Sequence, residues 1–274
     1  MILIFPCRES KMIIFYGLSN YIHTMSIEVI PVRDLPIFQK GDSFAAEICK
    51  KADLEDGDVI CLASAVYSKT KGYFRSYDSI TPGKKAIEIA EKCGEDPRFI
   101  QVVLDDTEDI IQEYPFVLSQ LKCGHVGVRA GVDNSNIEIG YIVSLPPEPM
   151  KAAEEVREEF KAITGKDIRV IITDTCGRSF RRGQTGVAIG WAGMKAICDF
   201  RGKIDLFGRV LEITEEAVVD EFSAFANFIM GESNEGIPAV IFRNCPHWEG
   251  HDNLYFTPQE DITRKALKKL NNLE

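Results

Sequence analysis

Residues 170–190, VIITDTCGRSFRRGQTGVAIG, are the stretch from which the fold and the function of this chain are best predicted. The stretch begins with the apolar, β-branched run Val170–Ile172, which predicts a buried strand. The run ends at Asp174 and Thr175, which offer a carboxylate and a hydroxyl oxygen. Because both are hard ligands of the kind that Mg²⁺ and Mn²⁺ bind, the end of this strand is a candidate divalent-metal site.

Three arginines come directly after this strand, Arg178, Arg181 and Arg182, in a turn between Gly177 and Gly183. A carboxylate, a metal ion and guanidinium groups can together hold a phosphate chain and neutralise its charge. On spacing alone, an ordinary surface turn with solvated or paired arginines fits equally well. The choice between the two interpretations therefore depends on the rest of the chain.

Length and charge restrict the class of protein. With 274 residues the chain can form one large domain or two modest ones. Its net charge of −10 disfavours a nucleic-acid partner and favours a small phosphate-bearing ligand held by metal ions and a few cations. No apolar run reaches the roughly 18 residues of a membrane span, so we expect no membrane partner.

The cysteines indicate a reducing compartment. They are scattered, without a CxxC pair or zinc-site spacing to the four histidines, at Cys7, Cys49, Cys61, Cys93, Cys123, Cys176, Cys198 and Cys245. Buried free thiols in the cytoplasm are the simplest interpretation. Cys176 lies inside the opening stretch, but no histidine is near it in sequence, so a catalytic thiol is the minor alternative.

The first 24 residues differ in character from the rest of the chain. They are apolar and aromatic, interrupted by Arg8, Glu9 and Lys11, and they make a poor signal peptide. Regular strand-like sequence begins at Met25. We expect that Met25 is the natural start and that residues 1–24 are an over-extended segment; a genuine additional hairpin or anchor is the alternative.

Hydrophobic periodicity predicts a mixture of strands and helices. Strands are expected at 26–32, 59–63, 116–131, 170–172 and 239–242. Helices are expected at 44–51, 81–93, 97–113, 151–164, 215–230 and 261–270. Neither a GK[ST] phosphate loop nor a GxGxxG motif is present, so a P-loop or Rossmann fold is not supported. The acids from Asp105 to Asp109 are expected to form a solvated face.

Polar turns elsewhere could complete the site at Asp174. Asp133 lies in the turn 133–136, Glu232 lies in the glycine-flanked loop 231–236, and Ser64 and Lys69 come after the strand at 59–63. Such residues also form ordinary turns and caps, and their spacing does not show that they converge.

Four motifs occur together and carry a resemblance. They are AGVDNSN at 130–136, the stretch 171–190, DLFGR at 205–209 and MGESNEGIPAV at 230–240. In this order and at these separations they resemble the coenzyme F420-0:gamma-glutamyl ligase family. The resemblance extends from Met25 to near the C-terminus.

The resemblance implies a GTP-dependent ligase of coenzyme F420 biosynthesis. Such an enzyme phosphorylates the terminal carboxylate of F420-0, and the amine of L-glutamate then attacks the acyl phosphate to form an amide. A second round can add a gamma-linked glutamate. The family also implies α+β subunits with mixed sheets and flanking helices, which form homodimers with nucleotide sites near the subunit interface. The domain would comprise residues 25–274, as one unit or two subdomains.

Residue by residue, the resemblance implies two divalent ions, Mn²⁺ or Mg²⁺, with K⁺ as a further candidate ion. Asp133 and Asp174 match one metal site, and Thr175 and Glu232 match the second. Asp174 and Arg178 are the candidate catalytic residues. The GTP contacts implied are Arg33, Asp34, Leu35, Pro36, Ala63, Ser64, Lys69, Asn136, Met230, Gly231, Glu232, Ser233, Asn234, Glu235, Gly236 and Ile237. Arg33-Asp34 departs from the family pattern, which leaves the base or ribose preference open.

Three other functions remain to be separated from this one. Another nucleotide-dependent amino-acid ligase would carry similar phosphate and metal motifs. A non-catalytic metal- and nucleotide-binding protein would keep the acids but release no phosphate. A structural α+β protein would use the acids as caps and leave the arginines solvated.

Overall fold

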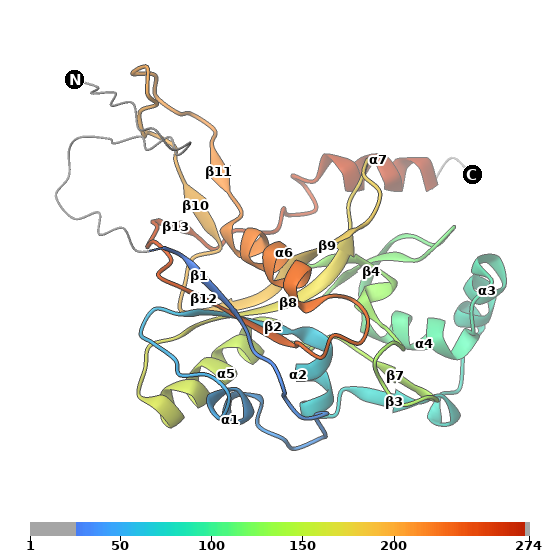
Figure 1. The fold of residues 1–274 in the computed structure, drawn as a ribbon. Helices are drawn as coiled ribbons and strands as arrows, with labels where there is room; N and C mark the ends of the chain where they lie inside the picture. Colours follow the sequence, from blue (N-terminus) through green and yellow to red (C-terminus); the bar gives the residue numbers. More distant parts are fainter. Residues whose placement is uncertain (1–25, 272–274) are drawn as a thin grey trace, which may run out of the picture.

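The computed structural model describes residues 26–271, so the expectation about residues 1–24 lies outside the described part. A five-stranded sheet with the order β1-β12-β2-β8-β9 forms the centre of the protein (Figure 1). Its strands are β1 (Glu28–Pro31), β12 (Ala239–Arg243), β2 (Val59–Ala63), β8 (Arg169–Gly177) and β9 (Gln184–Ala192). β2 and β8 are parallel, and the other neighbouring pairs are antiparallel.

Both faces of this sheet are covered, which explains why its central strands are apolar throughout. On β2, Ile60 and Leu62 join one hydrophobic cluster, whereas Val59 and Cys61 join a second cluster. The first cluster packs against α1 (Phe44–Cys49) and α5 (Pro149–Thr164), and the second packs against α6 (Val218–Met230). Figure 1 shows α6 on one side of the sheet and α1 and α5 on the other.

Glycines allow helices to approach β9 closely. A Cβ atom at Gly190 would lie 2.1 Å from the carbonyl oxygen of Pro149 in α5. A Cβ atom at Gly186 would lie 2.2 Å from the carbonyl oxygen of Ser223 in α6. Neither contact leaves room for a side chain, so both glycines are required by close packing rather than by backbone conformation.

Smaller sheets and further helices flank the main sheet (Figure 1). The small sheets are β3 (Phe74–Ser76) with β7 (Tyr141–Val143), β4 (Thr107–Gln112) with β5 (Leu118–Leu121) and β6 (Val126–Val128), and β10 (Ile197–Asp199) with β11 (Glu215–Glu216) and β13 (Gly250–His251). The remaining helices are α2 (Ser64–Lys71), α3 (Lys84–Cys93), α4 (Pro97–Asp106) and α7 (Ile262–Asn271), with single 3₁₀ turns η1 (Tyr77–Ser79) and η2 (Arg129–Gly131). The expected α+β class with mixed sheets and flanking helices is therefore confirmed.

The predicted helix 97–113 is wrong in its second half. α4 ends at Asp106, and residues 107–112 form β4, which pairs with β5. Two physical features explain the break. Acids at a helix C-terminus oppose the helix dipole, and the β-branched residues Thr107, Ile110 and Ile111 favour a strand. The expected strand 116–131 is likewise two short strands and η2.

Two further differences change the type of an element rather than only its ends. No helix was expected directly after β2, but Ser64–Lys71 is the helix α2, which ends at Gly72 in the left-handed conformation. Gly after a basic last turn is the usual C-terminal signal of a helix. The expected helix 215–230 begins only at Val218, because Glu215 and Glu216 pair with β10.

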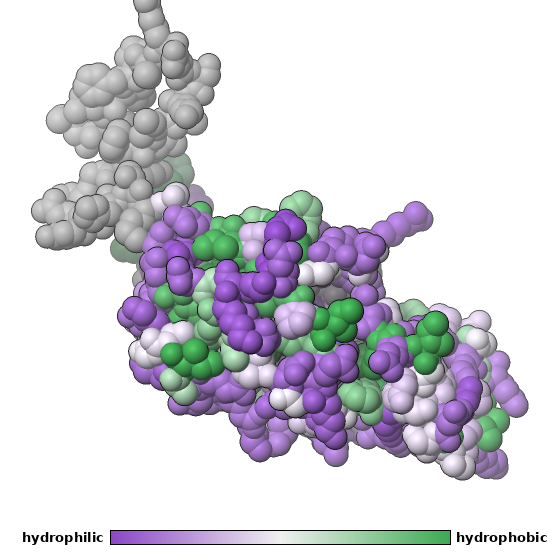
Figure 2. All heavy atoms as spheres, turned by 60° about the horizontal axis from the view of Figure 1, so that its bottom comes forward, coloured by the Kyte–Doolittle hydropathy of each residue, from purple (hydrophilic) through white to green (hydrophobic). Residues whose placement is uncertain are grey.

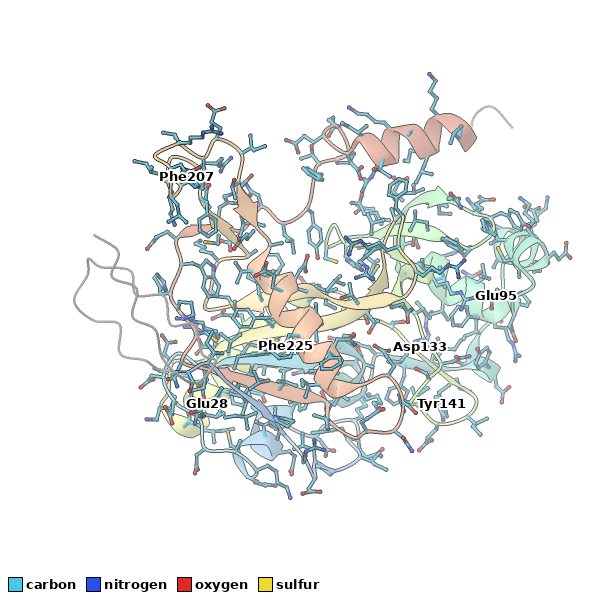
Figure 3. The ribbon with its side chains drawn as sticks, turned by 45° about the horizontal axis from the view of Figure 1, so that its top comes forward. Glu28, Glu95, Asp133, Tyr141, Phe207 and Phe225 are labelled. Atoms are coloured by element: carbon cyan, nitrogen blue, oxygen red, sulfur yellow. The ribbon has the colours of Figure 1, made fainter. Side chains whose placement is uncertain are left out.

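An arm, residues 197–216, projects from the main body and carries Phe207 at its tip (Figures 1 and 3). Its base is held by charged side chains. Arg201 donates to both carboxylate oxygens of Asp199 and lies 3.1 Å from Glu215, which in turn lies 2.5 Å from Nε2 of His251. This network joins the arm to β13.

The acidic segment at the end of α4 is paired rather than fully solvated. Asp105 accepts a hydrogen bond from Arg75, and Asp109 accepts from Lys268 of α7 at 2.6 Å. α7 also places the buried Arg264 against Gln120 of β5. The C-terminal helix is therefore fixed to the β4-β5-β6 sheet by its basic residues.

Three observations concern the surface, the helices and the cysteines of the described residues. Figure 2 shows hydrophobic residues in separate small groups among hydrophilic ones on the face that it presents. Within residues 26–271 no helix has the length and apolarity needed to cross a bilayer. The seven cysteines that the structure describes are free thiols, as expected, but only Cys61 and Cys198 are buried.

Candidate functional site

A cavity of about 1150 Å³ opens at the carboxyl ends of the parallel strands β2 and β8. β2 ends at Ala63 and leads directly into α2, and β8 continues through Asp174 into the hairpin with β9. The η2–β7 segment and the loop 231–236 complete its walls. The carboxyl ends of parallel strands are where ligands usually bind in open sheets, so this cavity is the candidate active site.

Asp174 lies on the wall where β2 and β8 meet. Its Oδ1 accepts a hydrogen bond of 3.1 Å from the hydroxyl of Ser64, the first residue of α2. Loss of water around the carboxyl group raises the pKa of Asp174 to about 7, and the nearby charges of Asp133 and Glu232 act in the same direction. The hydrogen bond from Ser64 opposes this shift only in part.

Thr175 and Glu232 are in direct contact. The hydroxyl of Thr175 donates to Oε1 of Glu232 at 3.0 Å, which joins β8 to the loop 231–236. Asn227, in the last turn of α6, donates to the same Oε1 at 2.5 Å. The two residues predicted for the second metal site are thus brought together by the fold.

Asp133 begins a tight polar turn in the η2–β7 segment of the cavity wall. Its Oδ1 accepts hydrogen bonds from the backbone N–H groups of Asn134 and Ser135, at 2.7 and 3.0 Å. Lys69 of α2 donates to the carbonyl oxygen of Asn136 at 3.0 Å, and burial lowers the pKa of Lys69. These contacts fasten the turn to α2 beside the cavity.

The chemistry of this donor set fits divalent ions. Asp133, Asp174 and Glu232 form no ion pair with any lysine, arginine or histidine in the described part of the chain. Burial, with the charges of Asp133 and Glu232, raises the pKa of Asp174, so a bound cation would stabilise its carboxylate form. All the ligand atoms offered, including the Thr175 hydroxyl, are hard oxygens, which suit Mg²⁺ or Mn²⁺.

The three carboxylates are too widely spread to form one compact cluster. Within residues 26–271, the group of three acidic, histidine or cysteine ligand atoms within 4.8 Å of one another is instead Asp199, Glu215 and His251. Arg201 already neutralises that group at the base of the arm. The spread of the acids around the cavity suits separate ions better than a single shared one.

Most residues predicted to contact the nucleotide line this cavity. They are Leu35, Pro36, Ala63, Ser64, Lys69, Asn136 and residues 230–237. Arg33 and Asp34 do not line it, and both are exposed in the turn after β1. The fold therefore brings most of the predicted nucleotide contacts to one cavity and leaves Arg33 and Asp34 outside its lining; whether they contact a nucleotide stays a prediction.

The arginine turn is not brought into the cavity. Arg178, Arg181 and Arg182 are exposed in the β8–β9 hairpin, and none lines the cavity wall. Among the described residues they form no ion pair with an acid. In this conformation Arg178 is therefore separated from Asp174, although both were candidate catalytic residues.

Several polar residues of the cavity wall were not predicted, among them Asn227 and His125. His125 is 5% exposed, its Nε2 has no hydrogen-bond partner among residues 26–271, and burial lowers its pKa to about 4. Both residues lie in segments whose apolar pattern indicates only core packing, so a single sequence carries no signal for them. Cys176 also lines the cavity, but burial raises the pKa of its thiol, which makes it a poor nucleophile.

The family model and the similar proteins identify the same family for this chain. A model of the family described as F420-0:Gamma-glutamyl ligase matches residues 33–244, a range that spans all the lining residues of the cavity. A protein of Archaeoglobus fulgidus named Coenzyme F420:L-glutamate ligase is 43% identical over 247 residues, covering 89% of this chain and 99% of its own length.

Two further relatives carry the same name. The protein of Methanosarcina mazei is 41% identical over 252 residues, covering 90% of this chain and 99% of its own length. The protein of Methanocaldococcus jannaschii is 43% identical over 239 residues, covering 86% of this chain and 95% of its own length. Similarity of this extent covers nearly the whole length of each relative.

Proposed function

The chain belongs to the F420-0:gamma-glutamyl ligase family and is a ligase, and we propose that it joins L-glutamate to coenzyme F420-0 in F420 biosynthesis with GTP as co-substrate. The observation that carries the proposal is the convergence of Asp133, Asp174, Thr175 and Glu232, from three separate motifs, on one cavity. The names of the relatives support F420 and L-glutamate as the substrates.

The proposed reaction has two steps. A carboxylate oxygen of F420-0 attacks the γ-phosphorus of GTP, GDP leaves, and an acyl phosphate forms. The neutral amine of L-glutamate then attacks the acyl carbon, the nitrogen loses one proton, phosphate leaves, and an amide bond remains. Phosphorylation is needed because a carboxylate is a poor electrophile without a good leaving group.

The residues of the cavity supply position and charge rather than covalent chemistry. Asp133 with Asp174, and Thr175 with Glu232, would each hold one divalent ion, and such ions neutralise charge that develops on the transferred phosphoryl group. The loop 231–236 and the segment Ala63–Ser64 would hold the nucleotide through backbone and hydroxyl groups. Lys69 adds a cation on the same wall. K⁺ remains a further candidate ion, to be tested by its replacement with Na⁺.

We also propose that the protein is a cytoplasmic homodimer. Free cysteines throughout the described residues support a reducing compartment. Dimerisation is supported by the arm, where exposed apolar side chains gather: Ile204, Leu206, Phe207, Val210 and Ile213. Light scattering with size-exclusion chromatography is expected to give twice the 30.7 kDa mass of one chain; a mass of one chain at micromolar concentration would contradict it.

The test of the activity is incubation with F420-0, L-glutamate, GTP and Mn²⁺, followed by mass spectrometry. The expected product carries one added glutamyl group, or two if a second round occurs, with stoichiometric release of phosphate. Glutamate added to a different carboxylate, with none added to F420-0, would favour another amino-acid ligase. Nucleotide binding without any phosphate release would favour a non-catalytic protein.

A further inference from the structure

Asn227 connects three elements at the edge of the cavity. Its Nδ2 lies 2.5 Å from Oε1 of Glu232 and 3.4 Å from Oγ1 of Thr175. Thr175 itself donates to Oε1 of Glu232 at 3.0 Å. The three side chains therefore form a closed ring of hydrogen bonds that joins α6, β8 and the loop 231–236.

The orientation of the Asn227 amide follows from this ring. Its NH₂ group must face Glu232, because its carbonyl oxygen at 2.5 Å would repel the carboxylate. The same NH₂ group also donates to Oγ1 of Thr175, which accepts this bond while it donates its own hydrogen to Glu232. Thr175 and Glu232 are thereby prevented from turning away from the cavity.

The backbone fixes Asn227 as firmly as its side chain does. Asn227 lies in the last turn of α6, and its carbonyl oxygen accepts from the backbone N–H of Gly231 at 2.9 Å. A Cβ atom at Gly186 would lie only 2.7 Å from Cβ of Asn227, so helix and strand are in direct contact here. The amide is held in place before any ligand binds.

We propose that Asn227 is a positioning residue, which orients Thr175 and Glu232 so that their oxygens bind the second divalent ion. The inference rests on the proposed function, because that function supplies the second divalent ion. The ring of hydrogen bonds does not depend on the proposed function. Asn227 lines the same cavity, from a helix that carries none of the other metal or nucleotide candidates before Met230. Partners that orient metal ligands commonly change metal affinity by 10–100-fold when they are removed.

The test measures Mn²⁺ binding rather than turnover. Wild type, Asn227→Leu and Asn227→Ala are titrated with Mn²⁺ by calorimetry and by electron paramagnetic resonance, with and without saturating GDP. A leucine side chain has a volume similar to that of asparagine but no hydrogen-bond donor. The alanine variant shows whether any effect of leucine comes from its packing rather than from the lost donor. Asn253→Ala is the control, because Asn253 is exposed and lies next to His251, away from the cavity. Thermal unfolding in EDTA verifies that each variant is folded.

The expected result is two Mn²⁺ ions in wild type and in Asn253→Ala. In both Asn227 variants one ion should bind 10–100-fold more weakly and the other unchanged. Two ions of unaltered affinity in either folded Asn227 variant would overturn the role of Asn227 while leaving the proposed function intact. Absence of Mn²⁺ binding to wild type would overturn the metal-dependent function and this inference together.

Discussion

The hydroxyl of Ser64 donates a hydrogen bond of 3.1 Å to Asp174 across 110 residues of sequence. The bond joins the ends of β2 and β8, the one parallel pair in the main sheet. It places the buried N-terminus of α2 beside a carboxylate whose pKa is raised to about 7. The geometry of the site therefore depends on a strand pair whose members are far apart in the chain.

The first prediction concerns Asp174. Asp174→Ala should abolish glutamate ligation, with a loss of at least about 10³-fold in kcat/KM, because charge stabilisation at a metal-held phosphoryl group is lost. The measurement is product formation by mass spectrometry at saturating Mn²⁺, with thermal unfolding to verify the fold. Turnover close to wild type under these conditions would remove Asp174 from the metal site.

The second prediction is a pH dependence that comes from the same carboxyl group. Between pH 4 and 7 the folded protein retains a proton on Asp174 that the unfolded chain has lost, so this contribution to stability is present below about pH 4 and disappears as the pH rises through 7. Asp174→Asn removes the titration. In EDTA, its free energy of unfolding relative to wild type should rise between pH 5 and 8 by on the order of 2 kcal/mol, after allowance for partial exposure.

Urea unfolding at several pH values in that window measures the effect. Added Mn²⁺ should recover the wild-type stability at pH 8 but have a smaller effect on the Asn variant, because it loses one anionic ligand. Parallel pH profiles for the two proteins in EDTA would contradict the assignment.

The main sheet shows most clearly which elements local sequence determines. β2, β12 and the first part of β8 were predicted because their residues are apolar on both faces, a signal that local sequence carries; the polar end of β8, residues 173–177, was not predicted as strand. α2 was missed because its residues, SAVYSKTK, have weak amphipathic character, and its first turn is fixed by the tertiary contact from Ser64 to Asp174. The local sequence feature that indicated this helix was Gly72, which ends it.

In the candidate site too, local sequence predicts some features and tertiary contacts determine the others. Acids in polar turns can be identified from the sequence, but their convergence depends on the parallel pairing of β2 with β8 and on the position of the 231–236 loop. Asn227 could not be predicted because it lies within the apolar helix segment Val218–Met230. Arg178 is the opposite case: its charge suits the chemistry, but the structure places it outside the cavity wall, so its role stays a prediction.

The third prediction separates the two interpretations of the arginine turn. If this turn binds an anionic substrate, Arg178→Ala, Arg181→Ala and Arg182→Ala should each raise an apparent KM several-fold and leave kcat nearly unchanged, since exposed charges contribute modest, screened attraction. Initial rates at varied GTP and at varied F420-0 identify the anion. Lys84→Ala, at an exposed position of α3 outside the cavity wall, is the control for loss of a surface charge. If KM and kcat of all three variants equal those of wild type, the turn is an ordinary solvated turn that binds no substrate.

The fourth prediction concerns the buried imidazole of His125. Burial lowers its pKa from 6.5 to about 4, so it contributes stability that is present above pH 6.5 and is lost as the pH falls towards 4. His125→Leu should therefore unfold less steeply with acid than wild type over this range. The measurement is the free energy of unfolding from pH 7 to 4, with His247→Leu, an exposed residue, as the control. Equal acid sensitivity of wild type and His125→Leu would show that the imidazole becomes charged inside the fold.

The last prediction tests the close contact between α5 and β9. Gly190→Ala would place a Cβ atom 2.1 Å from the carbonyl oxygen of Pro149, a backbone atom that cannot rotate away. Relief requires α5 and β9 to separate, at a cost of about 2 kcal/mol or more in the free energy of unfolding. Gly177→Ala is a matched control at the far end of β8, because its Cβ would meet no atom of the described residues within 4 Å. Urea denaturation should show a large loss for Gly190→Ala and almost none for Gly177→Ala. Equal stability of the two variants would mean that the helix does not rest on the backbone of β9 in solution.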